Sequence, residues 1–262
     1  MNFEDDLRGK RVLVTGACGV VGRWIAEAFA NAGAHVCLTD ARQQDLEALA
    51  SKPPFTDSFL WPADLRDAAA IDTLVTEAGK RWGGIDVLVN NAGLYPSSFL
   101  LDLEADDWDR VMDVNVRAPF LLSRAVARQM IAGGIKGTII NVSSGASRKM
   151  RSTAVPYCVS KTALDRLTKG FALELAEHGI RVNALEPGFA QGSVVSPLTG
   201  AHIEATRAAI PLGRPTSATD VANTVLFLAS SAAAYVTGAT LTVDGGNSIG
   251  SQAVYQDKKH AL

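Results

Sequence analysis

Cysteine, histidine and net charge are all scarce in this sequence, and each scarcity excludes a class of protein. The 262 residues include only three cysteines and four histidines, and neither set has the close spacing of a metal site or a C-x-x-C motif. A formal net charge of −2 gives no overall attraction for nucleic acid or for an anionic membrane. We therefore expect a reduced protein with no metal site and no nucleic-acid partner.

Long apolar runs are missing as well. No uninterrupted apolar segment approaches the roughly 18 residues that suggest a transmembrane helix, and the first residues are acidic before they are apolar. The sequence thus predicts neither a signal peptide nor a membrane anchor, and it favours a cytoplasmic location. The hydrophobic content of 47% can fill a sizeable core, which we expect to belong to one domain spanning residues 1–262.

Segments typical of strands and of helices alternate along the chain. The strands are predicted at Arg11–Thr15, His35–Thr39, Phe59–Pro62, Ile85–Val89, Gly137–Val142, Arg181–Leu185 and Ala239–Val243. Helical spacing occupies much of the sequence between them, including one long helix from about Asp106 to Ile131. This order predicts an α/β fold, a Rossmann-type doubly wound domain whose seven-stranded parallel sheet has helices on both faces.

The first predicted strand leads into a glycine-rich turn, T-G-A-C-G-V-V-G, and then into a helical pattern. Gly16 allows the chain to turn, and a small residue lets a pyrophosphate approach the amino end of the helix. This unit predicts a dinucleotide site whose phosphate-side residues are Gly16, Cys18, Gly19, Val20 and Val21.

The second predicted strand ends at Asp40, about 20 residues beyond the glycines. A carboxylate there can accept hydrogen bonds from the adenosine ribose hydroxyls, whereas a 2′-phosphate would meet a like charge. At about 4 Å and an effective dielectric constant of about 20, that repulsion is about 4 kcal/mol per charge pair. NAD(H) is therefore favoured, and NADP(H) stays possible because Arg42 could swing toward such a phosphate.

The segment from Asn141 to Lys161 contains the elements of a proton-transfer device. Ser144 follows an apolar strand, so its hydroxyl should emerge at the carboxyl edge of the sheet, where such folds bind ligands. Tyr157 and Lys161 are four residues apart in a segment with helical spacing, which places them on one helix face. A nearby ammonium can lower the pKa of a tyrosine, so we expect Tyr157 to exchange a proton with an alcohol or ketone while Ser144 hydrogen-bonds the same oxygen.

Taken in order, the glycine turn, N-N-A-G at Asn90–Gly93 and the Ser144, Tyr157, Lys161 spacing resemble the single-domain branch of the short-chain dehydrogenase/reductase family over about residues 9–247. The resemblance implies that those three residues and Asn115 are catalytic. It implies that the lysine also holds the nicotinamide ribose, and that Asn115 bends its helix and holds a water in a proton relay. Further cofactor contacts are implied for Asp64, Leu65, Asn91, Ala92, Gly93, Pro187, Gly188, Phe189 and Ser193.

Two cofactor positions depart from the family pattern. Val20 stands where the single-domain branch usually has its middle glycine, and Gly19 comes one place earlier, which resembles the longer sugar-nucleotide branch. Gly192 stands where a threonine is usual, and we expect Ser193 to replace the missing hydroxyl. By position, a segment at about 190–215 covers the substrate, and the chain ends in a polar tail at 251–262.

The resemblance implies an NAD(H)-dependent oxidoreductase that interconverts a secondary alcohol and a ketone, with Tyr157 as general acid/base. Alternatives are an NADPH-dependent 3-oxoacyl thioester reductase, a nucleotide-sugar epimerase or dehydratase, and a non-catalytic nucleotide-binding protein. The substrate pocket is expected at Tyr95, Ala146, Arg151 and Phe189, and the basic cluster of Arg148, Lys149 and Arg151 favours an anionic substrate. Surplus apolar residues on the Asn115 and Tyr157 helices fit the homotetramer usual in the family.

Overall fold

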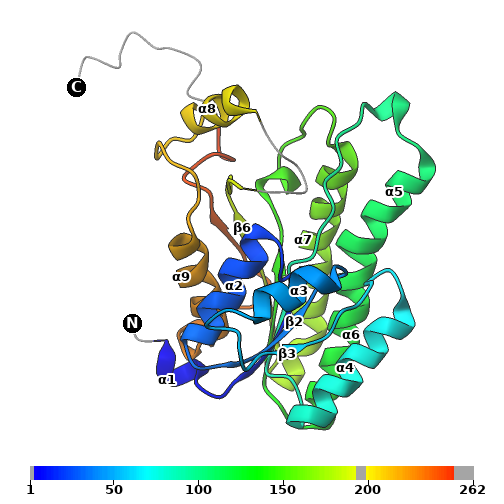
Figure 1. Cartoon of the computed structure of the whole chain (residues 1–262), viewed down its shortest axis with the longest axis vertical. Helices are drawn as coiled ribbons and strands as arrows, with labels where there is room; N and C mark the ends of the chain where they lie inside the picture. Colours follow the sequence, from blue (N-terminus) through cyan, green and yellow to red (C-terminus); the bar gives the residue numbers. More distant parts are fainter. Residues whose placement is uncertain (1–2, 193–198, 251–262) are drawn as a thin grey trace.

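Seven strands form one parallel sheet in the computed structural model, which describes residues 3–192 and 199–250 (Figure 1). The strands are β1 (Arg11–Thr15), β2 (His35–Thr39), β3 (Phe59–Leu60), β4 (Val87–Asn90), β5 (Thr138–Val142), β6 (Arg181–Pro187) and β7 (Thr240–Val243). Their order across the sheet is β3-β2-β1-β4-β5-β6-β7, and every adjacent pair is parallel. The predicted doubly wound architecture is confirmed.

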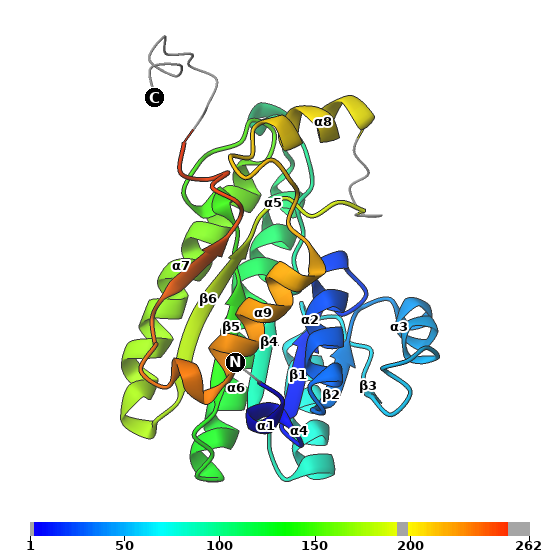
Figure 2. The same cartoon turned by 90° about the vertical axis from the view of Figure 1, so that its left-hand side faces the viewer.

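Helices cover both faces of the sheet, which explains why most strand positions are apolar. One face carries α1 (Glu4–Leu7), α2 (Val20–Asn31) and α9 (Ala218–Ala229), and the other carries α4 (Ala68–Trp82), α6 (Ala118–Ala132) and α7 (Val155–Leu175) (Figure 2). In β1, Val12 and Val14 pack into the core beneath α2 and α9, whereas Leu13 packs into the opposite core. Because successive side chains alternate between two buried faces, a polar side chain in such a strand costs free energy unless a hydrogen-bond partner compensates it.

Two helix boundaries follow directly from local sequence. After α7 the chain makes a short 3₁₀ turn to His178 and leaves the helix through Gly179, which has φ of 70° as expected for a glycine at this position. Ser217 caps α9 in a reciprocal box with Asp220, since each side chain binds the backbone amide of the other residue. Both boundaries are thus set by capping residues that lie within a few positions of the helix ends.

The predicted single helix from Asp106 to Ile131 is wrong in one respect. The structure has α5 (Ala105–Met112), a π-helical turn at Asp113–Arg117, and then α6. Pro119 has no amide hydrogen to donate to the carbonyl four residues earlier, at Asn115, so the α-helical ladder is interrupted there. Such π turns are frequent at functional sites, and this one contains a fully buried Asn115.

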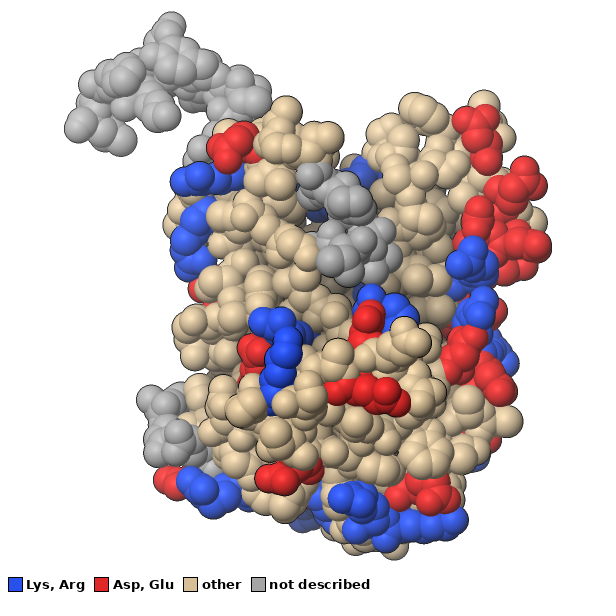
Figure 3. All heavy atoms as spheres, in the orientation of Figure 1, with Lys and Arg blue, Asp and Glu red and all other residues tan. Residues whose placement is uncertain are grey.

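The carboxyl ends of the strands lie at the upper end of the molecule in Figure 2, and α8 (Gly200–Ala208) lies beyond them. This helix was not predicted. Its first turn is capped by Thr199, which accepts from the backbone amide of His202 at 3.3 Å. In space-filling view the surface is hollowed between the lobe with α8 and the lobe with the start of α5 (Figure 3). No helix within the described residues is long and apolar enough to cross a membrane.

Candidate functional site

The turn between β1 and α2 is shaped by two glycines. Gly16 has φ of 63°, and a Cβ atom there would lie 2.8 Å from the Cα atom of Ala92. A Cβ atom at Gly22 would lie 2.1 Å from the Gly16 carbonyl oxygen, so α2 can pack this closely only with glycine. Gly22 was not among the predicted site residues, although it is the third glycine of the turn motif.

The amino end of α2 is suited to an anion. Its N-cap residue is Gly19, and no side chain within the described residues caps the helix. The first backbone amides, which include those of Val20 and Val21, therefore stay available for a ligand, and the helix dipole favours negative charge there. The loop after β6 borders this end, because a Cβ atom at Gly192 would lie 4.0 Å from Cγ2 of Val20. These residues fit the pyrophosphate of a dinucleotide.

Asp40 lies directly after β2, beside the glycine turn. Its Oδ2 atom accepts from the Cys18 backbone amide at 3.1 Å, and only 9% of its side chain is exposed. Burial, reinforced by the Asp40 charge, raises the pKa of the Cys18 thiol to about 12, so this cysteine stays protonated at neutral pH. The carboxylate is thus fixed where the predicted adenosine ribose would lie.

Asparagine side chains tie the carboxyl ends of neighbouring strands together. Asn90 donates to Oδ1 of Asn141 on β5 at 2.8 Å, and Asn141 in turn donates to Oγ1 of Thr168 on α7 at 2.9 Å. Asn91 donates to the carbonyl oxygens of Thr15 and Gly16 at 2.9 and 3.1 Å. These bonds fix the relative positions of β1, β4 and β5 at the edge where the reactive residues lie.

Ser144 and Tyr157 come from different elements but lie close enough for the Ser144 hydroxyl to lower the pKa of the Tyr157 phenol. Ser144 follows β5, and its Oγ atom also accepts from the Ala146 amide at 3.2 Å. Lys161, one turn beyond Tyr157 on α7, is 4% exposed and donates from Nζ to the Val142 carbonyl oxygen at 2.7 Å. Its Nζ atom lies 5.7 Å from the centre of the Tyr157 ring. The structure brings the predicted trio together.

Burial controls the protonation of this trio. It raises the pKa of Tyr157 above that of an ordinary tyrosine, against the hydrogen bond from Ser144 and the charge of Arg151. Burial also lowers the pKa of Lys161 to about 8, against the charge of Asp165. The prediction that Lys161 would lower the pKa of Tyr157 is therefore wrong for the protein's own groups, because desolvation of the phenolate outweighs the neighbouring charges.

Asn115 connects the π turn to two parts of the site. Its Oδ1 atom accepts from the Leu94 amide at 2.7 Å, and its Nδ2 atom donates to the Leu94 carbonyl at 2.8 Å and to Oγ of Ser160 at 3.0 Å. A Cβ atom at Gly93 would lie 3.5 Å from Oδ1 of Asn115 and 3.7 Å from Nζ of Lys161. Asn115 thus holds the loop after β4 against α7, and its part in a water relay stays a prediction.

The remaining predicted cofactor positions lie at the same edge. Pro187 ends β6, and a Cβ atom at Gly188 would lie 2.5 Å from Oγ1 of Thr216, whose amide donates to the Phe189 carbonyl at 2.9 Å. Leu65 is buried, whereas the Asp64 carboxylate is paired with Arg66 at 2.6 Å. Ser193 lies outside the described residues.

The substrate side of the site is built around Tyr157. The ring of Tyr95 meets the ring of Tyr157 edge-on with centroids 5.9 Å apart, and Ala146 is buried behind Ser144. Thr153 has φ of 65°, which is unusual for a β-branched residue. It is held by hydrogen bonds of 2.9 Å from both Ser97 and Ser98, so the loop before α7 is fixed to the loop after β4.

The predicted basic cluster is divided by the structure. Arg148 donates to the buried Glu186 at 2.6 Å and to Ser248 at 2.7 Å, and Lys149 donates to the Asn247 carbonyl at 2.8 Å. Arg151 is exposed, and its side chain bonds no residue of the described ranges. Only Arg151 is therefore available to an anion, and the assignment of the other two to an anion site is wrong because their charges serve the fold.

Glu186 is a residue that sequence reasoning missed. It is fully buried near the end of β6, and it accepts from Oγ of Ser147 at 2.7 Å and from Oγ1 of Thr242 at 2.8 Å besides Arg148. These bonds connect the loop after Ser144 to β6 and β7. A carboxylate inside a predicted buried strand was the available signal, since such a residue needs partners. Across the described ranges, no cluster of three His, Cys, Asp or Glu side chains could hold a metal ion.

Comparisons with known proteins agree with this geometry. A family model described as enoyl-(acyl carrier protein) reductase matches residues 16–248. Sorbitol dehydrogenase from Cereibacter sphaeroides is 36% identical over 258 residues, which cover 92% of this chain and 98% of that protein. The 3-oxoacyl-(acyl-carrier-protein) reductase from Rickettsia felis is 35% identical, with 92% and 98% covered. A solved gluconate 5-dehydrogenase from Burkholderia cenocepacia J2315, in complex with NADP and tartrate, has a TM-score of 0.87 and 34% identity, with 94% and 99% covered.

Proposed function

Because the chain belongs to the short-chain dehydrogenase/reductase family, we propose that it is an NAD(H)-dependent dehydrogenase interconverting a secondary alcohol and a ketone on a polyol or sugar acid. The observation that carries this proposal is the convergence of three side chains at the carboxyl edge of the sheet: Ser144 acts on the Tyr157 phenol, and the buried Lys161, one turn away on α7, has its Nζ atom 5.7 Å from the centre of the Tyr157 ring. A nicotinamide dinucleotide, when bound, supplies or accepts the hydride that no side chain can carry.

The protein's own groups move the proton. In ketone reduction, Tyr157 donates its hydroxyl proton to the substrate oxygen while Ser144 hydrogen-bonds that oxygen. The raised pKa of Tyr157 keeps the phenol protonated at neutral pH, which suits this direction. In alcohol oxidation the phenolate form of Tyr157 accepts the hydroxyl proton of the substrate and becomes the neutral phenol, and the neighbouring ammonium of Lys161 stabilises that phenolate before the transfer.

The cofactor preference rests on Asp40. The glycine turn and the uncapped amino end of α2 fit the pyrophosphate, and Asp40 is held beside them by the Cys18 amide. A hydroxyl on the adenosine ribose can donate to this carboxylate, whereas a 2′-phosphate is repelled by it. NADP in the gluconate 5-dehydrogenase structure is evidence about that protein, and the charge of Asp40 favours NAD(H) here.

The test is a panel of substrates read at 340 nm. Sorbitol, gluconate and other polyols are offered with NAD⁺ or NADP⁺, and matching ketones with NADH or NADPH. We expect turnover with at least one polyol or sugar acid, and a higher kcat/KM with NAD(H). Absence of turnover with every alcohol and ketone, in protein that binds NADH, would remove the proposal.

A 3-oxoacyl thioester reductase is the second candidate. The description of the matching family model and the Rickettsia felis relative favour it. An acetoacetyl thioester with NADPH in the same panel separates the two candidates. If that pair exceeds every polyol in kcat/KM, the second candidate replaces the first.

Arg151 favours an anionic substrate within the proposed class. Its guanidinium is exposed and has no partner within the described chain. Its positive charge works to lower the pKa of Tyr157, which shows that Arg151 lies near the reactive phenol. Gluconate and sorbitol form a matched pair, because they differ at one carbon in carrying a carboxylate or a neutral hydroxyl. Arg151→Ala should raise KM for gluconate about tenfold and leave sorbitol within about twofold, with a smaller difference at high salt. Equal effects on the KM values of gluconate and sorbitol would show that Arg151 does not recognise the carboxylate and is an ordinary exposed loop residue.

The segment at about 190–215 and the assembly complete the proposal. Helix α8 lies beyond the carboxyl edge of the sheet, which suits a cover over the substrate (Figure 2).

Most apolar side chains of α6 and α7 are buried within the chain, but Phe120 is 39% and Leu173 is 82% exposed. We expect these helices to pair between subunits in a homotetramer, and light scattering at micromolar concentration would refute this if it gave the monomer mass.

A further inference from the structure

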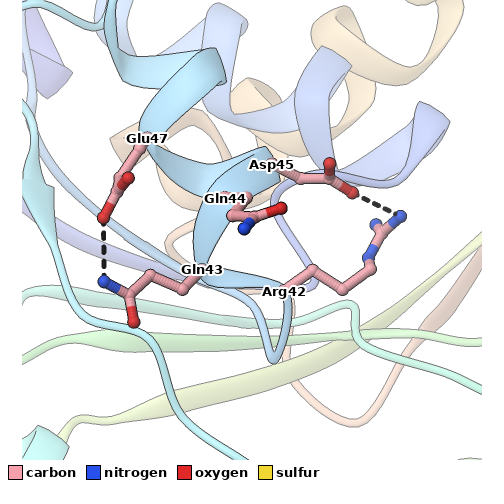
Figure 4. Close-up of a pocket in the computed structure, with 5 residues that line it drawn as sticks. All are labelled: Arg42, Gln43, Gln44, Asp45 and Glu47. Atoms are coloured by element: carbon pink, nitrogen blue, oxygen red, sulfur yellow. Dashed lines mark hydrogen bonds and ion pairs between the residues drawn. The ribbon is translucent and has the colours of Figure 1, made fainter.

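Arg42 is held between two carboxylates at the start of α3 (Gln43–Ala50). Its Nε atom lies 3.3 Å from Oδ1 of Asp40, and its Nη1 atom lies 2.8 Å from Oδ2 of Asp45. Figure 4 shows the guanidinium turned toward Asp45 across a surface hollow of about 680 Å³. The hollow is lined by Arg42, Gln43, Gln44, Asp45 and Glu47.

The two carboxylates that hold Arg42 have different duties. Asp40 is mostly buried and is fixed on its other oxygen by the Cys18 amide, so it belongs to the cofactor site itself. Asp45 is 54% exposed and makes its ion pair with Arg42 alone among the described residues. Asp45 therefore restrains Nη1 of the arginine in addition to the restraint that Asp40 places on Nε.

We propose that Asp45 is a cofactor-specificity residue that acts through Arg42. By holding Nη1, it keeps the guanidinium from turning to a phosphate on the adenosine ribose. This inference deepens the proposed NAD(H) preference and rests on it. Asp40 repels a 2′-phosphate directly. Asp45 acts indirectly, because it holds Arg42, the cation that could bind such a phosphate.

The local charge agrees with this division. Asp40 and Asp45 contribute two negative charges and Arg42 contributes one positive charge, so the three carry a net −1. Without Asp45 the remaining pair is neutral, and the guanidinium keeps only its bond to Asp40. A fork of N–H donors released in this way matches the geometry of a phosphate.

Glu47 provides a matched control on the same helix. It lines the same hollow and has the same charge, but its Oε1 atom accepts from Nε2 of Gln43 at 2.8 Å. Substituting Glu47 therefore removes one negative charge near the hollow without releasing Arg42. If removing any negative charge near the hollow strengthens NADPH binding, Glu47→Ala strengthens it as well. If the release of Arg42 is what strengthens NADPH binding, only Asp45→Ala does so.

The experiment measures equilibrium dissociation constants of NADH and NADPH by fluorescence for the wild type, Asp45→Ala, Glu47→Ala and Asp45→Ala/Arg42→Met. We expect Asp45→Ala to shift the NADPH-to-NADH ratio of dissociation constants about tenfold toward NADPH. Glu47→Ala should shift it by less than about threefold, because screening weakens an unpaired surface charge. The double variant should lose the gain, since it lacks the cation that Asp45 releases.

The outcomes separate this inference from the function on which it rests. If the wild type already binds NADPH more tightly than NADH, the proposed NAD(H) preference is wrong. If the wild type prefers NADH but Asp45→Ala behaves like Glu47→Ala, only the role of Asp45 is overturned. If the double variant keeps the gain of Asp45→Ala, Arg42 is not the group that Asp45 controls.

Discussion

The two ends of the seven-stranded sheet use similar polar groups for different purposes. At the amino end, Arg11 donates from Nε and Nη2 to Asp86 at 2.6 and 2.8 Å and from Nη1 to the Trp82 carbonyl at 3.0 Å. At the carboxyl end, Lys161 is more buried than Arg11 or Asp86, and no described carboxylate lies within ion-pair distance of its ammonium group. A charge with complete partners stabilises a fold, whereas one held with few partners has a shifted pKa and is available for chemistry.

The pKa values express the same contrast. Burial raises the pKa of Asp86, but the hydrogen bonds from Arg11 outweigh it and leave that pKa below the ordinary value. At Lys161 and Tyr157 burial prevails. It lowers the pKa of Lys161 and raises the pKa of Tyr157, so that both shifts favour the neutral form of the side chain. The Arg11–Asp86 pair at the amino end therefore keeps both charges near neutral pH, whereas Lys161 at the carboxyl end has a pKa of about 8.

The largest expected effect is at Tyr157. Tyr157→Phe removes the hydroxyl and little volume, so kcat should fall about a thousandfold while NADH affinity and melting temperature stay nearly unchanged. Rates at 340 nm, NADH fluorescence titration and thermal melting measure the three quantities. Retention of more than about a tenth of the wild-type kcat would show that the carboxyl-end device does not work as described.

The pH dependence should reveal the lowered pKa of Lys161. Above about pH 8 the free enzyme loses the ammonium proton, so kcat/KM for NADH should be constant below that pH and fall by up to about tenfold per unit above it. Lys161→Arg keeps its proton to higher pH and should move the break upward. A wild-type profile that stays level to about pH 9.5 would contradict the shifted pKa.

Arg148 should have an intermediate effect, because it acts on Ser144 through the loop between them. Arg148→Met leaves the buried Glu186 with only neutral partners, and we expect kcat to fall about tenfold with KM for NADH nearly constant. Arg148→Lys keeps the charge and should recover part of the loss. If both variants melt earlier but keep the wild-type kcat, the ion pair serves stability alone.

Arg11→Met is the corresponding change at the other end and should have the smallest effect on catalysis. The variant loses its bonds to the partly buried Asp86, so the free energy of unfolding should fall by about 1–3 kcal/mol. Its kcat should stay within about twofold of the wild type. Urea unfolding and the 340 nm assay measure the two quantities, and a tenfold loss of kcat would break the proposed separation of the two ends.

Local signals made the sheet and the reactive trio predictable. The strands are rich in apolar residues, Ser144 follows one of them, and Tyr157 and Lys161 are one helical turn apart. Each of these relations spans only a few residues. The same is true of the caps at Gly179 and Ser217, whose bonds join residues only a few positions apart.

The features that were missed depend on contacts between distant residues. Glu186 finds Arg148 38 positions away and Thr242 56 positions away, and no local pattern predicts either bond. The pKa of Tyr157 depends on burial by the whole fold, so spacing to Lys161 alone gave the wrong direction. The π turn at Asn115 had a local signal in Pro119, but its stability also depends on the bonds to Leu94.

The double variant Ser144→Ala/Tyr157→Phe tests the central claim most directly, since Ser144 and Tyr157 are described as one device acting on one oxygen. Each single change removes part of that device, and residues that act as a unit have strongly non-additive effects. We predict that kcat of the double variant equals that of Tyr157→Phe within about threefold. A further loss as large as that of Ser144→Ala in the wild-type background would show that the two hydroxyls act independently and contradict the account.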